Sequence, residues 1–148
     1  MAFRFPLEVL FRLQRSVERQ RELLLQVANA RVDQATLQIE QVESWIRAYS
    51  DRQAQGLQTG MNAAEMHFAE RCHEVLKDYK QSLEAELSKL EKIRAERRSA
   101  FEEARRQREV THSLRERQLQ AYRSEVRRRE QRQVDDMFVM RRAPSRSE

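Results

Sequence analysis

Proline and glycine are almost absent from the interior of this 148-residue chain. Between Leu7 and Ala143 there is no proline, and the only glycines are Gly56 and Gly60. A fold with many short elements is excluded, because these residue types are the usual terminators of helices and the usual residues of tight turns. Aromatic residues make up only 7% of the chain and charged residues 36%, which suits a narrow helical seam rather than a thick core. The sequence therefore predicts an all-α protein with few, long helices.

Apolar residues recur at helical spacing along a first segment, which predicts a helix over residues 6–50. Pro6 suits the first helical position, and Glu8 lies near the positive end of the helix dipole. Two heptad frames follow each other in this segment, the first with Leu10, Leu13, Val17, Leu24 and Val27, and the second with Ala28, Val32, Ala35, Ile39, Val42, Ile46 and Tyr49. The consecutive steps of four at Leu24, Ala28 and Val32 predict a stutter.

Turn residues then predict a loop over residues 51–61, and a second helix over 62–140. Asn62 and Glu65 have the spacing of an N-cap and its capping-box glutamate. The apolar stripe of the second helix runs through Phe68, Cys72, Val75 or Leu76, Tyr79, Leu83, Leu87, Leu90, Ile93 and Phe101, with an irregular step at Tyr79, Leu83 and Leu87. Residues 141–148 are predicted to be a disordered tail.

The two irregular steps predict how the helices pair. In an antiparallel hairpin the numbers of facing residues add to a constant, and a sum of 111 places stutter against stutter, with Ala28 facing Leu83 and Leu24 facing Leu87. The same sum centres the hairpin inside the predicted loop. We therefore expect a single domain that folds as a long antiparallel two-helix coiled coil. With this pairing, the first residues of the first helix face positions near residue 105 of the second. Residues from about 110 to 140 are therefore expected to form a C-terminal helical overhang without an intramolecular partner.

Positive charge is concentrated toward the C-terminus. Residues 1–93 carry 13 Lys and Arg against 14 Asp and Glu, whereas residues 94–142 carry 15 against 9. The arginine-rich segment is either a solvated helix or a surface for an acidic partner. Binding to protein is the favoured alternative, since basic and aromatic residues do not interleave as a nucleic-acid stacking platform requires.

No catalytic, cofactor or metal site is predicted. Cys72 and His73 are adjacent and do not converge on one helix face as zinc ligands would, so Cys72 is read as a seam residue. No phosphate-binding glycine motif is present. No apolar run approaches the ~18 residues that span a bilayer, so a soluble cytosolic protein is expected. Trp45, Tyr49, Phe68 and Tyr79 cluster toward the loop, either as seam fillers or as anchors of a docking surface.

The chain resembles the FliJ family of flagellar protein export components. The resemblance rests on the opening MAFRFPLEVLFRLQRSVERQ, the C-terminal REQRQVDDMFVMRR, the length and the hairpin. It implies a non-enzymatic, stalk-like coiled coil of the flagellar type III export apparatus. Such a protein has no cofactor, binds the hexameric export ATPase and promotes its assembly, and links it to the membrane export gate and to export chaperones. It is peripheral to the cytoplasmic face of the membrane at the flagellar base.

The resemblance also implies two binding surfaces. The export gate would bind a loop-side surface of Gln38, Val42, Trp45, Tyr49, Phe68, Cys72, Val75 and Tyr79. The ATPase would bind a terminal surface of Leu10, Leu13, Arg123, Arg127, Arg128, Arg129 and Arg132. Two alternatives stay open, namely the equivalent stalk protein of a virulence type III secretion injectisome, and a structural or nucleic-acid-associated coiled coil.

Overall fold

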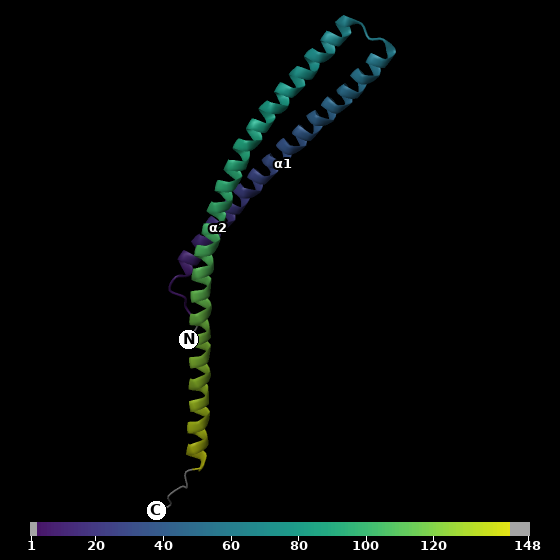
Figure 1. Ribbon diagram of the computed structural model, residues 1–148. Helices are drawn as coiled ribbons and strands as arrows, with labels where there is room; N and C mark the ends of the chain where they lie inside the picture. Colours follow the sequence, from purple (N-terminus) through teal and green to yellow (C-terminus); the bar gives the residue numbers. More distant parts are fainter. Residues whose placement is uncertain (1–2, 143–148) are drawn as a thin grey trace, which may run out of the picture. The chain divides into compact units, whose positions relative to one another are not determined.

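The computed structural model describes residues 3–142, which form two α-helices, α1 (Glu8–Thr59) and α2 (Ala63–Arg142) (Figure 1). The helices pack against each other in opposite directions, so the predicted all-α antiparallel coiled coil is confirmed. The chain divides into two compact units that each contain part of both helices. We call residues 19–103 the loop unit, and the described residues 3–18 with 104–142 the terminal unit. Residues 143–148 of the tail predicted over 141–148 lie outside the described residues.

The connection between α1 and α2 is short because both helix ends are capped. Gly60 has a φ of +93°, in the left-handed region that favours glycine. The Met61 N–H donates to the Gly56 carbonyl at 3.0 Å, which is the long hydrogen bond of a Schellman motif. At the start of α2, the Glu65 N–H donates to Asn62 Oδ1 at 2.8 Å, and the Asn62 N–H donates to Glu65 Oε2 at 3.0 Å. The predicted capping box is therefore confirmed.

The predicted loop over 51–61 is wrong for most of its length, because α1 continues to Thr59. Ser50 and Asp51 are exposed, so their polar side chains do not disturb the packed face. Gly56 lies inside the helix, where glycine costs about 1 kcal/mol relative to alanine but does not force an end. At the other end, α1 begins at Glu8 rather than Pro6, and the Glu8 N–H closes a preceding turn onto the Phe5 carbonyl at 3.2 Å.

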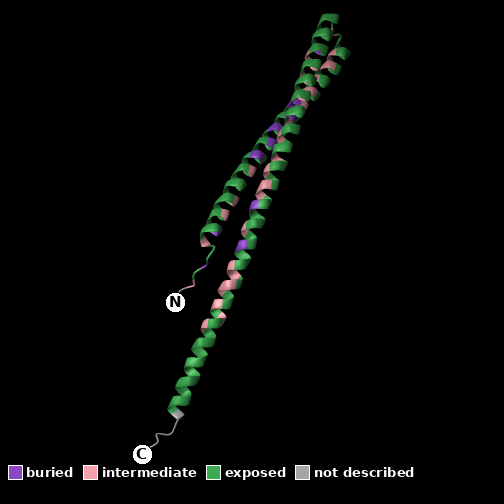
Figure 2. Ribbon diagram, turned by 90° about the vertical axis from the view of Figure 1, so that its left-hand side faces the viewer, coloured by how far each residue is buried: buried purple, intermediate pink, exposed green. Residues whose placement is uncertain are grey.

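An apolar seam holds the loop unit together. Ile39, Val42 and Leu83 form a buried cluster, and Ile46 and Leu87 pack against it. Val32 and Ala35 on α1 and Ala69 on α2 are also buried. Each fully buried branched side chain contributes about 1.5–3 kcal/mol relative to its exposed state. Figure 2 shows these buried positions recurring along the facing sides of the helices.

The predicted stutters are wrong, because the least exposed residues follow an uninterrupted heptad pattern. On α1 they alternate by three and four residues through Leu25, Ala28, Val32, Ala35, Ile39, Val42, Ile46 and Tyr49. On α2, Lys80 occupies the half-buried position expected for Tyr79, whose side chain is 49% exposed. Phe68 and Val75 likewise lie outside the seam and are exposed.

The register of the helices also differs from the predicted one. Lys80 Nζ lies 2.8 Å from Glu43 Oε1, and these position numbers add to 123 instead of 111. Leu83 packs with Ile39 and Val42 rather than facing Ala28. Leu87 packs against the same cluster and so does not face Leu24. The misplaced loop explains the error, because moving the turn to Gly60 shifts every facing pair by about twelve positions.

The overhang is shorter than predicted for the same reason. In the terminal unit, the Phe3 and Tyr122 rings lie 5.7 Å apart, so segment 110–122 has an intramolecular partner. Val126 is the last half-buried residue, and residues 127–141 are all exposed, as the uniformly green end of α2 in Figure 2 shows. We therefore define the overhang as residues 127–142. Positions 141 and 142, predicted to belong to the tail, are helical.

Candidate partner-binding surfaces

The residues of the loop-side surface all lie in the loop unit, and most of them are accessible. Trp45 and Tyr79 are 49% exposed, Val75 is 60% exposed and Phe68 is 68% exposed. Gln38 is exposed, whereas Tyr49 and Cys72 are half-buried. Val42 differs from the others, because it is 2% exposed and belongs to the buried cluster. Val42 therefore supports this surface from beneath.

The heptad pattern places these residues on one side of the loop unit. Gln38 and Trp45 each precede a core residue of α1 by one position, namely Ile39 and Ile46. Cys72 and Tyr79 precede the half-buried His73 and Lys80 of α2 in the same way. In an antiparallel pair, positions that precede the core residues lie on the same side in both helices. The two helices thus contribute jointly to this surface.

Tyr49 and Cys72 link the two helices within the surface. A hydrogen bond with the Cys72 side chain, together with burial, raises the pKa of the Tyr49 hydroxyl above its ordinary value. The hydroxyl is therefore protonated throughout the physiological range. Cys72 is a free, half-buried thiol that lies one position before His73, so it adjoins the seam instead of occupying the seam position predicted for it.

A cleft of about 610 Å³ adjoins this surface near the helix connection. Tyr49 and Phe68 of the predicted surface line it together with residues that the sequence analysis did not select, Arg52, Gln53, Met61, Asn62, Ala64, Glu65 and Ala69. Helical periodicity does not select them, because the turn residues predict a loop over residues 51–61. The available signal was Gly60, since a glycine followed by an N-cap asparagine marks a helix end next to a helix start.

The residues of the terminal surface fall into two groups in the terminal unit. Leu10 and Leu13 are 41% and 59% exposed on α1, beside the segment of α2 that contains His112 and Arg115. The arginines lie further along α2, and all five are exposed. Arg129 forms an ion pair with Glu125 one turn away, and Arg127 Nε donates to the Arg123 carbonyl at 3.4 Å. The two leucines and the five arginines of the predicted terminal surface therefore do not form one patch.

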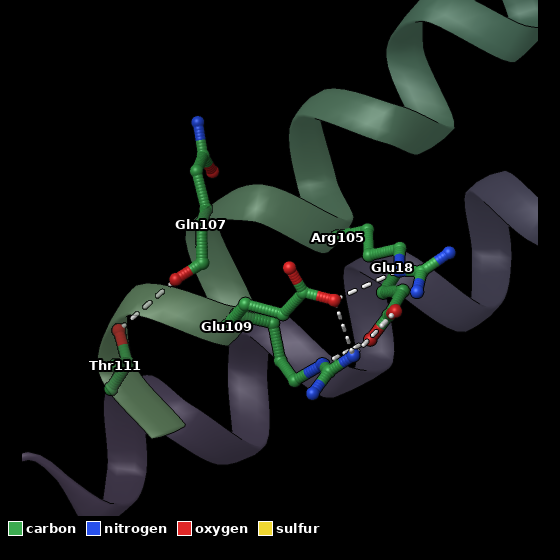
Figure 3. Close-up of polar contacts among 6 residues, drawn as sticks. Glu18, Arg105, Gln107, Glu109 and Thr111 are labelled. Carbon is green, nitrogen blue, oxygen red and sulfur yellow. Dashed lines mark hydrogen bonds and ion pairs between the residues drawn. The ribbon is translucent and has the colours of Figure 1, made fainter. Parts of the chain in front are cut away.

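Polar contacts hold the two helices of the terminal unit together. Arg108 donates to both carboxylate oxygens of Glu18, from Nε at 2.8 Å and from an outer guanidinium nitrogen at 3.2 Å. This bidentate bond raises the Arg108 pKa above its already high value, so the charge is permanent. Glu109 lies beside Arg108 and accepts from Arg105 Nε at 2.9 Å. Figure 3 shows Glu18 of α1 reaching this cluster on α2.

Aromatic and ionic contacts also join the two helices near the start of α1. The Phe11 and His112 rings stack at 5.8 Å with an interplanar angle of 19°, and the Arg115 guanidinium lies 5.7 Å from the Phe11 ring centre. Arg115 Nε is also 3.3 Å from Glu8 Oε2. Thr111 is buried and donates its hydroxyl to the Gln107 carbonyl of its own helix at 3.3 Å. The seam of the terminal unit thus combines the buried Phe5, Phe11 and Ala104 with ion pairs between the helices.

Within residues 3–142, no group of three or more His, Cys, Asp or Glu side chains is arranged to hold a metal ion. In the same part of the chain, neither helix contains a segment long and apolar enough to cross a membrane.

Comparison with known proteins gives one match. The family model described as Flagellar FliJ protein matches residues 3–147, which is nearly the whole chain. Neither the curated proteins nor the solved structures include a match.

Proposed function

The chain belongs to the FliJ family of flagellar proteins, and from this premise we propose that it is the stalk of the export apparatus that joins the export ATPase to the export gate. The family is a non-catalytic component of flagellar protein export, and the match over residues 3–147 is the observation that carries the proposal. In the proposed arrangement, the terminal unit binds the hexameric ATPase and promotes its assembly. The loop unit contacts the cytoplasmic domain of the membrane gate protein.

The distribution of charge supports this division of roles. In the terminal unit, residues 3–18 and 104–142 carry 15 arginines against 8 acidic residues, a formal net charge of +7. The loop unit carries 13 basic against 15 acidic residues, a net charge of −2. A basic helix is attracted to acidic loops at the entrance of a ring, through contacts that are steerable and sensitive to salt.

We predict that R127E/R128E/R129E weakens binding to the purified export ATPase, because three exposed positive charges in the overhang become negative. A pull-down at two salt concentrations measures the effect, with a loss of about tenfold or more expected at low salt. The matched control is K77E/K89E/K92E, which makes the same charge change on exposed residues of the loop unit. Equal loss in both variants, or retention by the arginine variant, would remove the overhang from the interface.

We predict that W45A weakens binding to the cytoplasmic domain of the gate protein. Trp45 is half-exposed, and an exposed aromatic anchor that becomes buried in an interface contributes about 2 kcal/mol or more. The matched control is L37A, which removes an exposed apolar side chain from the same helix. Titration calorimetry at constant temperature distinguishes the two. If W45A binds the gate domain as tightly as the unmodified chain, Trp45 does not belong to the site.

The proposal includes a peripheral position at the cytoplasmic face of the membrane and contacts with export chaperones. The match to a flagellar family model favours flagellar export over an injectisome. A deletion strain tests the assignment in the cell. Loss of motility and of exported filament, both restored by the gene, is the expected result, whereas a motile deletion strain would contradict it.

A further inference from the structure

The terminal unit leaves several apolar side chains exposed, although its seam buries only a few, among them Phe5 and Phe11. Leu10, Leu13 and Val17 of α1 are 41%, 59% and 36% exposed. Val110 and Leu114 of α2 are 71% and 39% exposed. Meanwhile the seam contains the ion pair of Glu18 with Arg108 and the buried Thr111. Exposed apolar residues that form a contiguous patch, unlike isolated ones, mark an interaction surface.

The exposed residues form a second heptad stripe beside the first. On α1, Leu10, Leu13 and Val17 are spaced by three and four, and each precedes a seam residue, namely Phe11, Gln14 or Glu18, by one position. On α2, Val110 precedes the buried Thr111, and Leu114 precedes Arg115. Because the helices are antiparallel, residues that precede the seam lie on the same side of both. A surface with heptad spacing on two adjacent helices is complementary to a third helix.

Register contacts place the two halves of this surface opposite each other. Glu8 pairs with Arg115, and Phe11 stacks on His112. Leu10 lies between Glu8 and Phe11 in sequence, and Leu114 lies between His112 and Arg115. The two leucines are therefore at the same level of the pair. Leu13 and Val110 follow one turn further along, so the apolar strip is continuous over at least two helical turns.

The charges around the strip select the occupant. Arg117 lies one turn after Leu114 on α2 and is exposed at one end of the strip. The acidic neighbours Glu109 and Glu18 are already paired with arginines. The terminal unit as a whole carries a net charge of +7. A third helix with acidic flanks would gain attraction here, whereas one with basic flanks would be repelled.

We infer that the outer face of the terminal unit, formed by Leu10, Leu13, Val17, Val110 and Leu114, receives an acidic amphipathic helix of a partner protein. The bound form is a three-helix bundle in which the partner supplies leucine-like residues at heptad spacing and carboxylates at the flanks. The inference deepens the proposed ATPase contact, since Leu10 and Leu13 belong to both. It rests on that proposed function only for the identity of the protein that provides the helix.

Two designed peptides test the inference on the full chain. Both are about three heptads long with leucine at the core positions, and they carry either glutamate or lysine at every flanking position, so that like charges prevent self-pairing. Binding is measured by fluorescence anisotropy. The expected result is that the glutamate peptide binds at least about tenfold more tightly than the lysine peptide.

Variants of exposed residues locate the binding site. L13S/V110S is expected to reduce the affinity for the glutamate peptide by about tenfold or more, because two side chains that would be buried in the complex lose their apolar surface. L37S, which alters an exposed leucine of the loop unit, is the control and should bind as the unmodified chain does. Circular dichroism verifies that both variants retain their helicity.

Three results would overturn the inference. These are absence of binding by the glutamate peptide, equal binding by both peptides, and insensitivity to L13S/V110S. A dimer in sedimentation experiments that L13S/V110S converts to a monomer would also overturn it, since a second copy of the chain would then occupy the face. Failure of the peptide test with an intact ATPase pull-down rejects the third helix alone. Failure of the pull-down with peptide binding intact rejects the ATPase as the partner instead.

Discussion

A partly buried bidentate ion pair distinguishes the seam of the terminal unit from that of the loop unit. In the loop unit the seam is formed by Ile39, Val42 and Leu83. In the terminal unit, equivalent heptad positions contain Glu18 and Arg108, whose side chains are only 18% and 24% exposed. A partly buried bidentate pair favours one register, because any slip leaves a charge without its partner. The Glu18–Arg108 pair therefore specifies the register within the terminal unit, as the Glu43–Lys80 pair does within the loop unit.

We predict that E18A and R108A each destabilise the chain by about 1–3 kcal/mol, because R108A leaves the Glu18 carboxylate without its partner and E18A removes the bidentate partner of Arg108. The double variant should cost less than the sum of the two, with a coupling energy of about 1–2 kcal/mol in a double-mutant cycle. Urea unfolding followed by circular dichroism provides the four free energies.

The control cycle uses Glu125 and Arg129, an exposed pair one turn apart on α2. Its coupling energy should be about 0.5 kcal/mol or less. A coupling energy for Glu18 and Arg108 no larger than that of the control would show that the bidentate pair does not specify the register.

At the scale of elements, the two helices and their opposite directions were predictable, whereas their register was not. The capping box of Asn62 and Glu65 was found because it requires two residue types at a fixed spacing. The predicted register was wrong because it depended on where the chain turns, and α1 continues to Thr59 instead of ending near residue 50. The face of α1 was also misassigned near its start, where the exposed Leu10 and Leu13 lie one position before Phe11 and Gln14 of the true seam.

The residues of the candidate site were likewise predictable only in part. The exposed aromatic residues Trp45 and Phe68 were identifiable, because large apolar side chains near a helix connection stand out in a charged sequence. Val42 was grouped with them, although it is buried, since its exposure depends on the seam position. Residues such as Arg52 that line the adjoining cleft depend on where α1 ends, and a single glycine decides that.

The two interior glycines allow a paired prediction about where α1 ends. Gly60 has a positive φ with open space around it, so G60A should destabilise the hairpin by about 1 kcal/mol through backbone strain alone. Gly56 is helical, and an added Cβ would lie 3.0 Å from the Met61 Sδ, at the flexible end of a side chain. G56A should therefore be neutral or stabilising, as alanine is the better helix former.

Thermal unfolding monitored by circular dichroism compares the two variants under the same conditions. The expected order of melting temperatures is G60A below the unmodified chain, with G56A at or above it. If G60A melts with or above the unmodified chain, Gly60 is not the residue that ends α1.

At the scale of the whole molecule, sequence and structure divide the chain into units of different chemistry. The loop unit combines an apolar core with exposed aromatic residues and a net charge of −2. The terminal unit combines a seam that contains the bidentate Glu18–Arg108 pair with an exposed apolar face and a net charge of +7. Two chemically distinct units on continuous helices suit a component that contacts two different partners. The family match identifies the process, flagellar protein export, in which those partners are to be found.

The proposed function requires that this chain binds the export ATPase and promotes its assembly without catalysing a reaction itself. The most direct measurement is the rate of ATP hydrolysis by the purified flagellar export ATPase as the chain is added, together with the fraction of ATPase in hexamers. We expect no hydrolysis by the chain alone, a rise in both quantities on mixing, and no rise with R127E/R128E/R129E. An unchanged rate and hexamer fraction at saturating chain, or full stimulation by the arginine variant, would contradict the proposed function.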